Sequence, residues 1–150
     1  MMPGEARCYR IELPFPPSVN HYWRTVVIGG RVRVIISADG RHFRHAVVKA
    51  VRAQRAALNL AARLAVDVVL NPPDRVRRDL DNFGGKALLD ALTHARVWND
   101  DEQIDDLHVR RGDVIKGGKC VVSIKELEEN QWMTLPFATN AGAPATKSAM

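Results

Sequence analysis

Two aspartates separated by one leucine are the side chains of this sequence best suited to chemistry. Asp79 and Asp81 lie in the run Arg-Arg-Asp-Leu-Asp-Asn at residues 77–82. On extended chain, residues two apart share a face, so both carboxylates would lie together with Leu80 directed into the core. Close carboxylates repel each other unless a cation or protons lie between them. Mg²⁺ commonly binds one or two carboxylates with water and substrate phosphate. The run therefore predicts a site for Mg²⁺, which Mn²⁺ could replace.

A second arrangement of the same residues stays open. Asp81 can cap the helix that follows, while Asp79 pairs with a neighbouring arginine. Asn82 can serve as the cap instead, which would leave Asp81 free for a cation.

A second acidic run, residues 99–103 (Asn-Asp-Asp-Glu-Gln), follows a helix predicted over 82–94. That helix is about 18 Å long. The run therefore lies near Asp79 only if the chain doubles back, as it would if a strand over Ile104–Arg111 pairs beside a strand over 64–70. A third carboxylate would then complete a metal site. Alone, such an exposed run is usually a solvated turn.

Lys86 lies on the same predicted helix, with Asp90 one turn later. The two can form an ordinary ion pair of the i,i+4 kind. Alternatively, the ammonium lies near a scissile phosphate and offsets charge in the transition state. Gly85 and Lys86 do not form a P-loop, because Leu80 and Ala87 replace the required glycine and Ser/Thr. We expect no nucleotide cofactor.

The charges of the chain are divided unevenly. Residues 1–78 contain 14 Lys/Arg and 5 Asp/Glu, whereas residues 79–150 contain 8 and 12. A basic body around a local acidic cluster suits a protein that binds a polyanion and concentrates cations at one place. Arg75, Arg77 and Arg78 directly precede the aspartates and are predicted to bind phosphates there. Composition alone fits solvated surface charge equally well.

The elements that must position these residues indicate an α+β fold. Hydrophobic alternation and helical spacing predict the order β-β-β-α-β-α-β-β, with one mixed sheet, two main helices packed on it and hairpins at both ends. Ser37 is predicted to cap the first helix, which would extend to about Asn59. Residues 14–24 contain three prolines and are predicted to be a loop. The predicted strands cover 9–13, 26–28, 31–36, 64–70, 104–111 and 120–125.

Length and composition predict one domain over residues 1–128. Residues 129–150 are expected to be a disordered tail. Cys8 and Cys120 cannot form a multi-disulfide framework, and no secretory signal or membrane-spanning apolar stretch is visible. We therefore expect a protein of the cytoplasm that does not bind a membrane.

Three motifs in order, RRDLDN, KALLDAL and WNDDEQI, resemble the RusA family of Holliday-junction resolvases. The segments LPFPPSVNHYWR and SADGRHFR are similar to the N-terminal half of that family. The resemblance covers about residues 9–126.

The resemblance implies a Mg²⁺-dependent endonuclease that resolves four-way DNA junctions by paired nicks in opposing strands. It also implies a homodimer that places two active sites on the junction, with Lys86 as the functional lysine and with Arg78 and Asn82 beside the DNA. Three carboxylates would bind Mg²⁺ and act in catalysis: those of Asp79, Asp81 and Asp101.

The spacing before Lys86 departs from the family. The family usually has two residues between the Asp-Asn pair and the lysine, whereas this sequence has three, Phe83, Gly84 and Gly85. One extra residue rotates a helix by about 100°. Two glycines can absorb it in a bulge or a late helix start. The alternative function is a non-catalytic, dimeric protein that binds DNA junctions through a degenerate acidic site.

Overall fold

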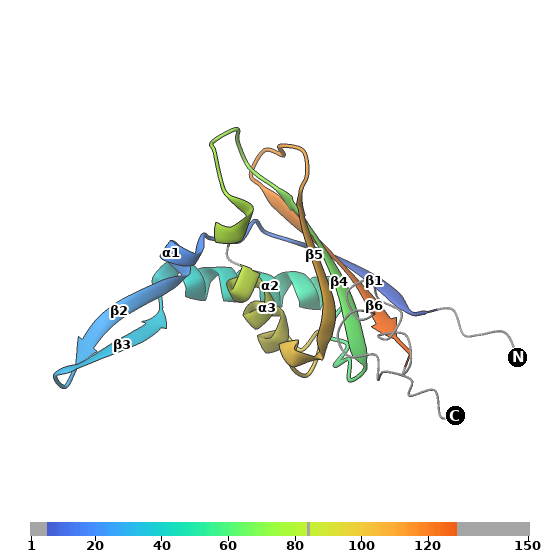
Figure 1. Cartoon of the computed structure of the whole chain (residues 1–150), viewed down its shortest axis with the longest axis horizontal. Helices are drawn as coiled ribbons and strands as arrows, with labels where there is room; N and C mark the ends of the chain where they lie inside the picture. The colour runs from blue at the N-terminus through green and yellow to red at the C-terminus, as the bar shows by residue number, and fades with distance from the viewer. Residues whose placement is uncertain (1–5, 84, 129–150) are drawn as a thin grey trace, which may run out of the picture.

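A four-stranded sheet forms the centre of the protein, which a computed structural model describes over residues 6–83 and 85–128 (Figure 1). Strands β1 (Cys8–Leu13), β6 (Lys119–Leu127), β4 (Arg63–Asn71) and β5 (Ile104–Arg111) follow one another across it. The β1–β6 and β6–β4 pairs are antiparallel and the β4–β5 pair is parallel. The predicted α+β class with a mixed sheet is confirmed. The tail predicted over 129–150 lies outside the described residues.

One face of the sheet is covered by the two main helices, α2 (Ala38–Ala53) and α3 (Gly85–His94) (Figure 1). Alternate residues of β4 form the core beneath them, and each is at most 2% exposed: Leu64, Val66, Val68 and Leu70. Because strand side chains alternate between faces, this pattern fixes which face of β4 meets the helices. Within the described residues, no helix has both the length and the apolar composition needed to cross a membrane.

Helix α2 begins as predicted but ends six residues early. The Ser37 hydroxyl oxygen accepts a hydrogen bond from the Gly40 amide at 3.0 Å, which satisfies one free donor of the first turn. The chain leaves the helix after Ala53, since Arg55 and Asn59 have positive φ values. The expected helix end at Asn59 is therefore wrong.

Strands β5 and β6 do not form the predicted C-terminal hairpin. Each pairs with β4 instead, β5 parallel and β6 antiparallel, so β4 lies between them. The predicted turn at Gly117 and Gly118 exists, with both residues at positive φ, but the connection crosses the end of β4. Turn residues indicate that the chain reverses. They do not show which strands pair across the reversal.

Strands β2 (Trp23–Ile28) and β3 (Arg31–Ile36) form the predicted N-terminal hairpin around two glycines with φ values of 59° and 76°. This two-stranded ribbon is a separate sheet that projects away from the helices (Figure 1). The expectation of a single sheet is therefore wrong. The loop predicted over 14–24 is also wrong in its last six residues, which form α1 (Val19–Tyr22) and the start of β2. Its prolines end at Pro17, so the later amides can form hydrogen bonds.

Candidate active site

The loop after β4 carries the arginines that were predicted to bind phosphates. Arg75 and Arg77 are exposed, and neither forms an ion pair within the described residues. Arg78 pairs with Asp74, Nη1 to Oδ1, at 2.6 Å, and its guanidinium carbon lies 5.7 Å from the centre of the Phe15 ring. Arg75 and Arg77 are thus free to meet an anion, whereas Arg78 must first give up an internal partner.

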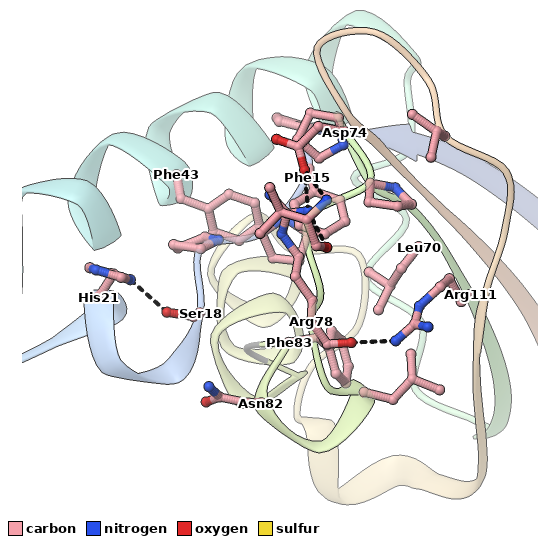
Figure 2. Close-up of a pocket in the computed structure, with 18 of the residues that line it drawn as sticks. Phe15, Ser18, His21, Phe43, Leu70, Asp74, Arg78, Asn82, Phe83 and Arg111 are labelled. Atoms are coloured by element: carbon pink, nitrogen blue, oxygen red, sulfur yellow. Dashed lines mark hydrogen bonds and ion pairs between the residues drawn. The ribbon is translucent and has the colours of Figure 1, made fainter.

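Internal hydrogen bonds give this loop its shape (Figure 2). The Asp74 carboxylate accepts from the Val76 amide at 3.0 Å and from Arg78. The hydrogen bond from Arg78 is the main reason that the pKa of Asp74 lies below its usual value. Arg111, the last residue of β5, donates to the main-chain carbonyl of Arg78. The residue just before Asp79 is therefore tied to the edge strand of the sheet.

Asp79 and Asp81 follow directly, but the backbone between them is not extended. Asp79 has φ −87° and ψ 140°, and the 3₁₀ turn η1 (Leu80–Asn82) begins at the next residue. The Asn82 amide donates to the Asp79 carbonyl at 3.2 Å and closes that turn. The predicted extended geometry is therefore wrong, and Leu80 is 39% exposed instead of buried in the core.

Both carboxylates are exposed and without an ion pair to any residue that the structure describes. Asp79 precedes η1 but makes no side-chain capping hydrogen bond. The arginine next to it, Arg78, pairs with Asp74. The alternative in which Asp79 pairs with a neighbouring arginine is therefore not seen. Exposed carboxylates without partners suit a hard cation such as Mg²⁺.

Helix α3 begins at Gly85, three residues later than predicted, so Lys86 lies in its first turn. Phe83 folds against this start, because a Cβ atom added to Gly85 would lie 2.6 Å from the Phe83 Cζ atom. The side chain of Lys86 is exposed, with its ammonium nitrogen 5.8 Å from the centre of the Trp23 ring. This distance suits a cation–π contact.

The predicted alternative partner of Lys86, Asp90, is bound by other residues. Its Oδ2 atom accepts from Arg44 of α2 at 2.6 Å and from the Tyr22 hydroxyl at 3.0 Å. Lys86 forms no ion pair within the described residues. The structure therefore leaves the lysine charge uncompensated by a carboxylate.

The second acidic run forms a structured turn, η2 (Asp101–Gln103), between α3 and β5. Asp100 accepts from the Glu102 amide at 3.0 Å, and the Gln103 side chain accepts from the Asp100 amide at 2.7 Å. Burial, then the neighbouring Asp100 carboxyl, and finally Asp90 raise the pKa of Asp101. The η2 turn that carries Asp101 contacts α3. The predicted doubling back is confirmed, since β5 pairs beside β4.

The structure does not gather the three predicted metal ligands into one cluster. Among residues 6–83 and 85–128, no three His, Cys, Asp or Glu side chains lie close enough together to hold one metal ion. Asp79 and Asp81 precede α3, whereas Asp101 follows it on η2, which folds back against the helix. Lys86 lies on the helix that separates the two acidic segments.

A pocket of about 930 Å³ opens beneath residues 74–78, the basic loop that carries Arg75, Arg77 and Arg78 (Figure 2). The rings of Phe15, Phe43 and Phe83 contribute apolar wall. Five predicted site residues also line it: Arg75, Arg77, Arg78, Asp79 and Asn82. Asp81, Lys86 and Asp101 are not part of its lining. Of the predicted metal ligands, Asp79 therefore shares the pocket wall with the three arginines, whereas Asp81 and Asp101 lie outside it.

Some residues that shape this region were not predicted from the sequence. Trp23 lay in the predicted loop, yet its ring meets Lys86. Gln103, 7% exposed, donates to the carbonyl groups of Leu60 and Ala62 and holds η2 in place. Arg63 of β4 binds Glu102 at 3.0 Å. The capping spacing of Asp100 and Gln103 was the one local signal available.

The family model described as Endodeoxyribonuclease RusA matches residues 14–125. A protein named crossover junction endodeoxyribonuclease, from Enterobacteria phage HK97, is 41% identical over 120 residues, which cover 80% of this chain and 96% of that protein. The protein of the same name from Enterobacteria phage 82 is 40% identical over 119 residues, covering 79% and 95%.

A bacterial relative gives the same result. The crossover junction endodeoxyribonuclease of Escherichia coli O139:H28 is 41% identical over 119 residues, covering 79% of this chain and 95% of its own. The matched range contains the basic loop, η1, α3 and η2, and so every residue of the candidate site. The chain belongs to the endodeoxyribonuclease RusA family.

Proposed function

We propose that this protein is a Mg²⁺-dependent, structure-selective endonuclease that resolves Holliday junctions by paired nicks in opposing strands. The observation that carries the proposal is the sequence of side chains along one exposed segment. Within the described residues, Arg75 and Arg77 form no ion pair, and neither do the carboxylates of Asp79 and Asp81, which follow Arg77 within four residues. Membership of a family whose relatives are named crossover junction endodeoxyribonucleases supports the substrate.

The acidic and basic residues of the candidate site would have different roles in cleavage. Asp79 and Asp81 would hold Mg²⁺, and Asp101 would be a third ligand. One or two carboxylates with water and substrate phosphate commonly satisfy Mg²⁺, so a preassembled triad is not required. The bound ion would supply positive charge at the phosphate and lower the pKa of a bound water. Lys86 has no carboxylate partner in the described chain and would offset charge that develops on the phosphate.

The basic loop positions the DNA. Arg75 and Arg77 would bind phosphates beside the cut, and Arg78 would join them by exchanging Asp74 for a phosphate. Asn82 is exposed at the end of η1 and would meet the same strand. A homodimer would bring two such sites to one junction, in the cytoplasm of a bacterial or phage-infected cell.

A cleavage assay on a synthetic four-way junction tests the proposal. Mg²⁺ and Mn²⁺ should support paired nicks, whereas Ca²⁺ should permit binding with little cleavage. A linear duplex with the sequence of one arm is the control and should remain uncut. Full cleavage in EDTA would contradict the role of the metal. Tight junction binding without cleavage under any metal would favour the non-catalytic junction-binding protein.

A further inference from the structure

The ribbon of β2 and β3 has two chemically different faces. Antiparallel pairing places Arg24 opposite Ile35, Val26 opposite Arg33, and Ile28 opposite Arg31, so one face carries an arginine in each cross-strand pair. Residues on the other face are uncharged, and the pairs there are Trp23–Ile36, Thr25–Val34 and Val27–Val32. Side chains of a strand alternate between faces, so the division follows from the register alone.

The three arginines have no counter-charge. Arg24, Arg31 and Arg33 are exposed, and none forms an ion pair with a described residue. Residues 23–36 contain no aspartate or glutamate. The arginine face therefore has a net charge of +3. Surface arginines that serve only solubility are usually interspersed with acidic residues.

The ribbon starts beside the candidate active site and leads away from it. Trp23, the first residue of β2, meets the ammonium of Lys86 at 5.8 Å. Tyr22, one residue earlier, bonds to Asp90, so the ribbon base is fixed to α3 on two helical turns. Figure 1 shows the ribbon extending from this point away from the sheet. Six residues per strand span about 20 Å, equivalent to roughly six base pairs of duplex DNA.

We propose that the arginine face of the β2–β3 ribbon binds the phosphate backbone of a DNA arm next to the nicked strand. The inference rests on the proposed function, because it takes branched DNA as the substrate. Its support is the charge of that face, the absence of paired acids, and the attachment of the ribbon beside Lys86. A two-stranded ribbon also has the width to enter the major groove of duplex DNA. An isolated hairpin is only marginally stable in water, so a DNA contact would also steady the ribbon.

The test compares two variants that lose the same charge. In Arg31→Gln/Arg33→Gln, two phosphate-binding groups are removed from the ribbon. In Arg7→Gln/Lys125→Gln, two exposed cations are removed near the first and last strands of the sheet, away from the ribbon. Junction affinity is measured at a series of salt concentrations in Ca²⁺, and the mass of each protein is measured by light scattering.

Each phosphate contact contributes about 0.9 to the slope of log affinity against log salt concentration. The ribbon variant should bind more weakly than wild type, with a slope smaller by about 1.8. The control should keep the wild-type affinity to within the loss expected from net charge alone, and its slope should not change. Both variants should retain the wild-type mass and circular dichroism spectrum.

Two results would overturn the inference. One is a ribbon variant whose affinity and salt slope equal those of wild type. The other is a ribbon variant that loses affinity together with half its mass, which would show that the ribbon contacts a second copy of the chain. Failure of the proposed function looks different, because wild-type protein itself would then neither bind nor cut the junction.

Discussion

Asp79 and Asp81 are exposed, and in the part of the chain that the structure describes they form no ion pair. Their negative charges would affect DNA binding in two opposing ways. Each carboxylate would hold the metal, yet each also repels the DNA backbone. Asp81→Asn removes a metal ligand and one negative charge together. Junction affinity should therefore hold or rise while cleavage falls by orders of magnitude. The same result is expected for Asp79→Asn.

The matched control is Asp113→Asn, which removes one charge from an exposed loop residue outside the candidate site. Its cleavage rate should equal that of wild type in a single-turnover assay. If Asp79→Asn and Asp81→Asn cut junctions at near wild-type rates, the assignment of the metal site is wrong.

The three arginines of the basic loop differ in whether they form an internal ion pair. Arg77 has no ion pair in the described part of the chain, while Arg78 is bound to Asp74 and lies over Phe15. Arg77→Ala should weaken junction binding and reduce the salt slope by about 0.9, the contribution of one phosphate contact. Arg78→Ala should reduce the slope equally if Arg78 exchanges Asp74 for phosphate. An unchanged slope for Arg78→Ala would confine that arginine to a structural role.

Lys86 lies over the Trp23 ring, and Asp90 pairs with Arg44 instead of with this lysine. A structural ion pair with Asp90 and a catalytic role at the phosphate therefore predict different results for its removal. Lys86→Ala should reduce cleavage by about 10²-fold, the scale for losing one electrostatic donor. Stability should hardly change, because no ion pair to Asp90 is lost. Lys125→Ala, which removes an exposed lysine of β6, should cleave normally. A Lys86→Ala protein that cuts at the wild-type rate would show that this lysine has no catalytic role.

At the scale of elements, the start of α3 decides where Lys86 lies. The helix begins at Gly85, where a Cβ atom would lie 2.6 Å from the Phe83 ring, and Lys86 is its second residue. A side chain at Gly85 would displace the Phe83 ring. Gly85→Ala should therefore lower the free energy of unfolding by about 1–3 kcal/mol, the usual cost of overpacking, and should also slow cleavage because η1 and Lys86 shift.

Phe83→Ala supplies the control for this change. In that background the obstructing ring is gone, so adding Gly85→Ala should be neutral or slightly stabilising, since alanine favours a helix over glycine. Denaturant unfolding of wild type, Phe83→Ala, Gly85→Ala and the double variant gives the coupling free energy between the two positions. Additive effects would mean that the ring does not constrain the helix start.

At the scale of the whole molecule, paired nicks require two active sites on one junction. Each chain carries a single segment in which Asp79 and Asp81 follow the basic loop. The protein should therefore form a homodimer, with a mass by light scattering twice that of the 16.7 kDa chain. Nicks on the two opposing strands should appear within one binding event on a circular junction substrate. A monomer that still makes paired nicks would exclude the dimer as their cause.

The sequence by itself determined much of this protein because the signals concerned are local. Alternation predicted the strands, Ser37 the start of α2, and Gly29-Gly30 the ribbon turn. Motif order identified the family, since spacing along the chain is enough to recognise it. Each of these depends on residues that are neighbours in the sequence.

Only the tertiary structure decided which distant segments meet. It placed β4 between β5 and β6, and it put Asp81 inside η1 directly after Asp79, where extended chain was expected. It also paired Asp90 with Arg44 and Tyr22 rather than with Lys86. These outcomes depend on long-range pairing and on competition among partners for one carboxylate. No periodicity or spacing encodes that competition, because the competing groups are separated by up to 68 residues and meet only after the sheet and helices pack.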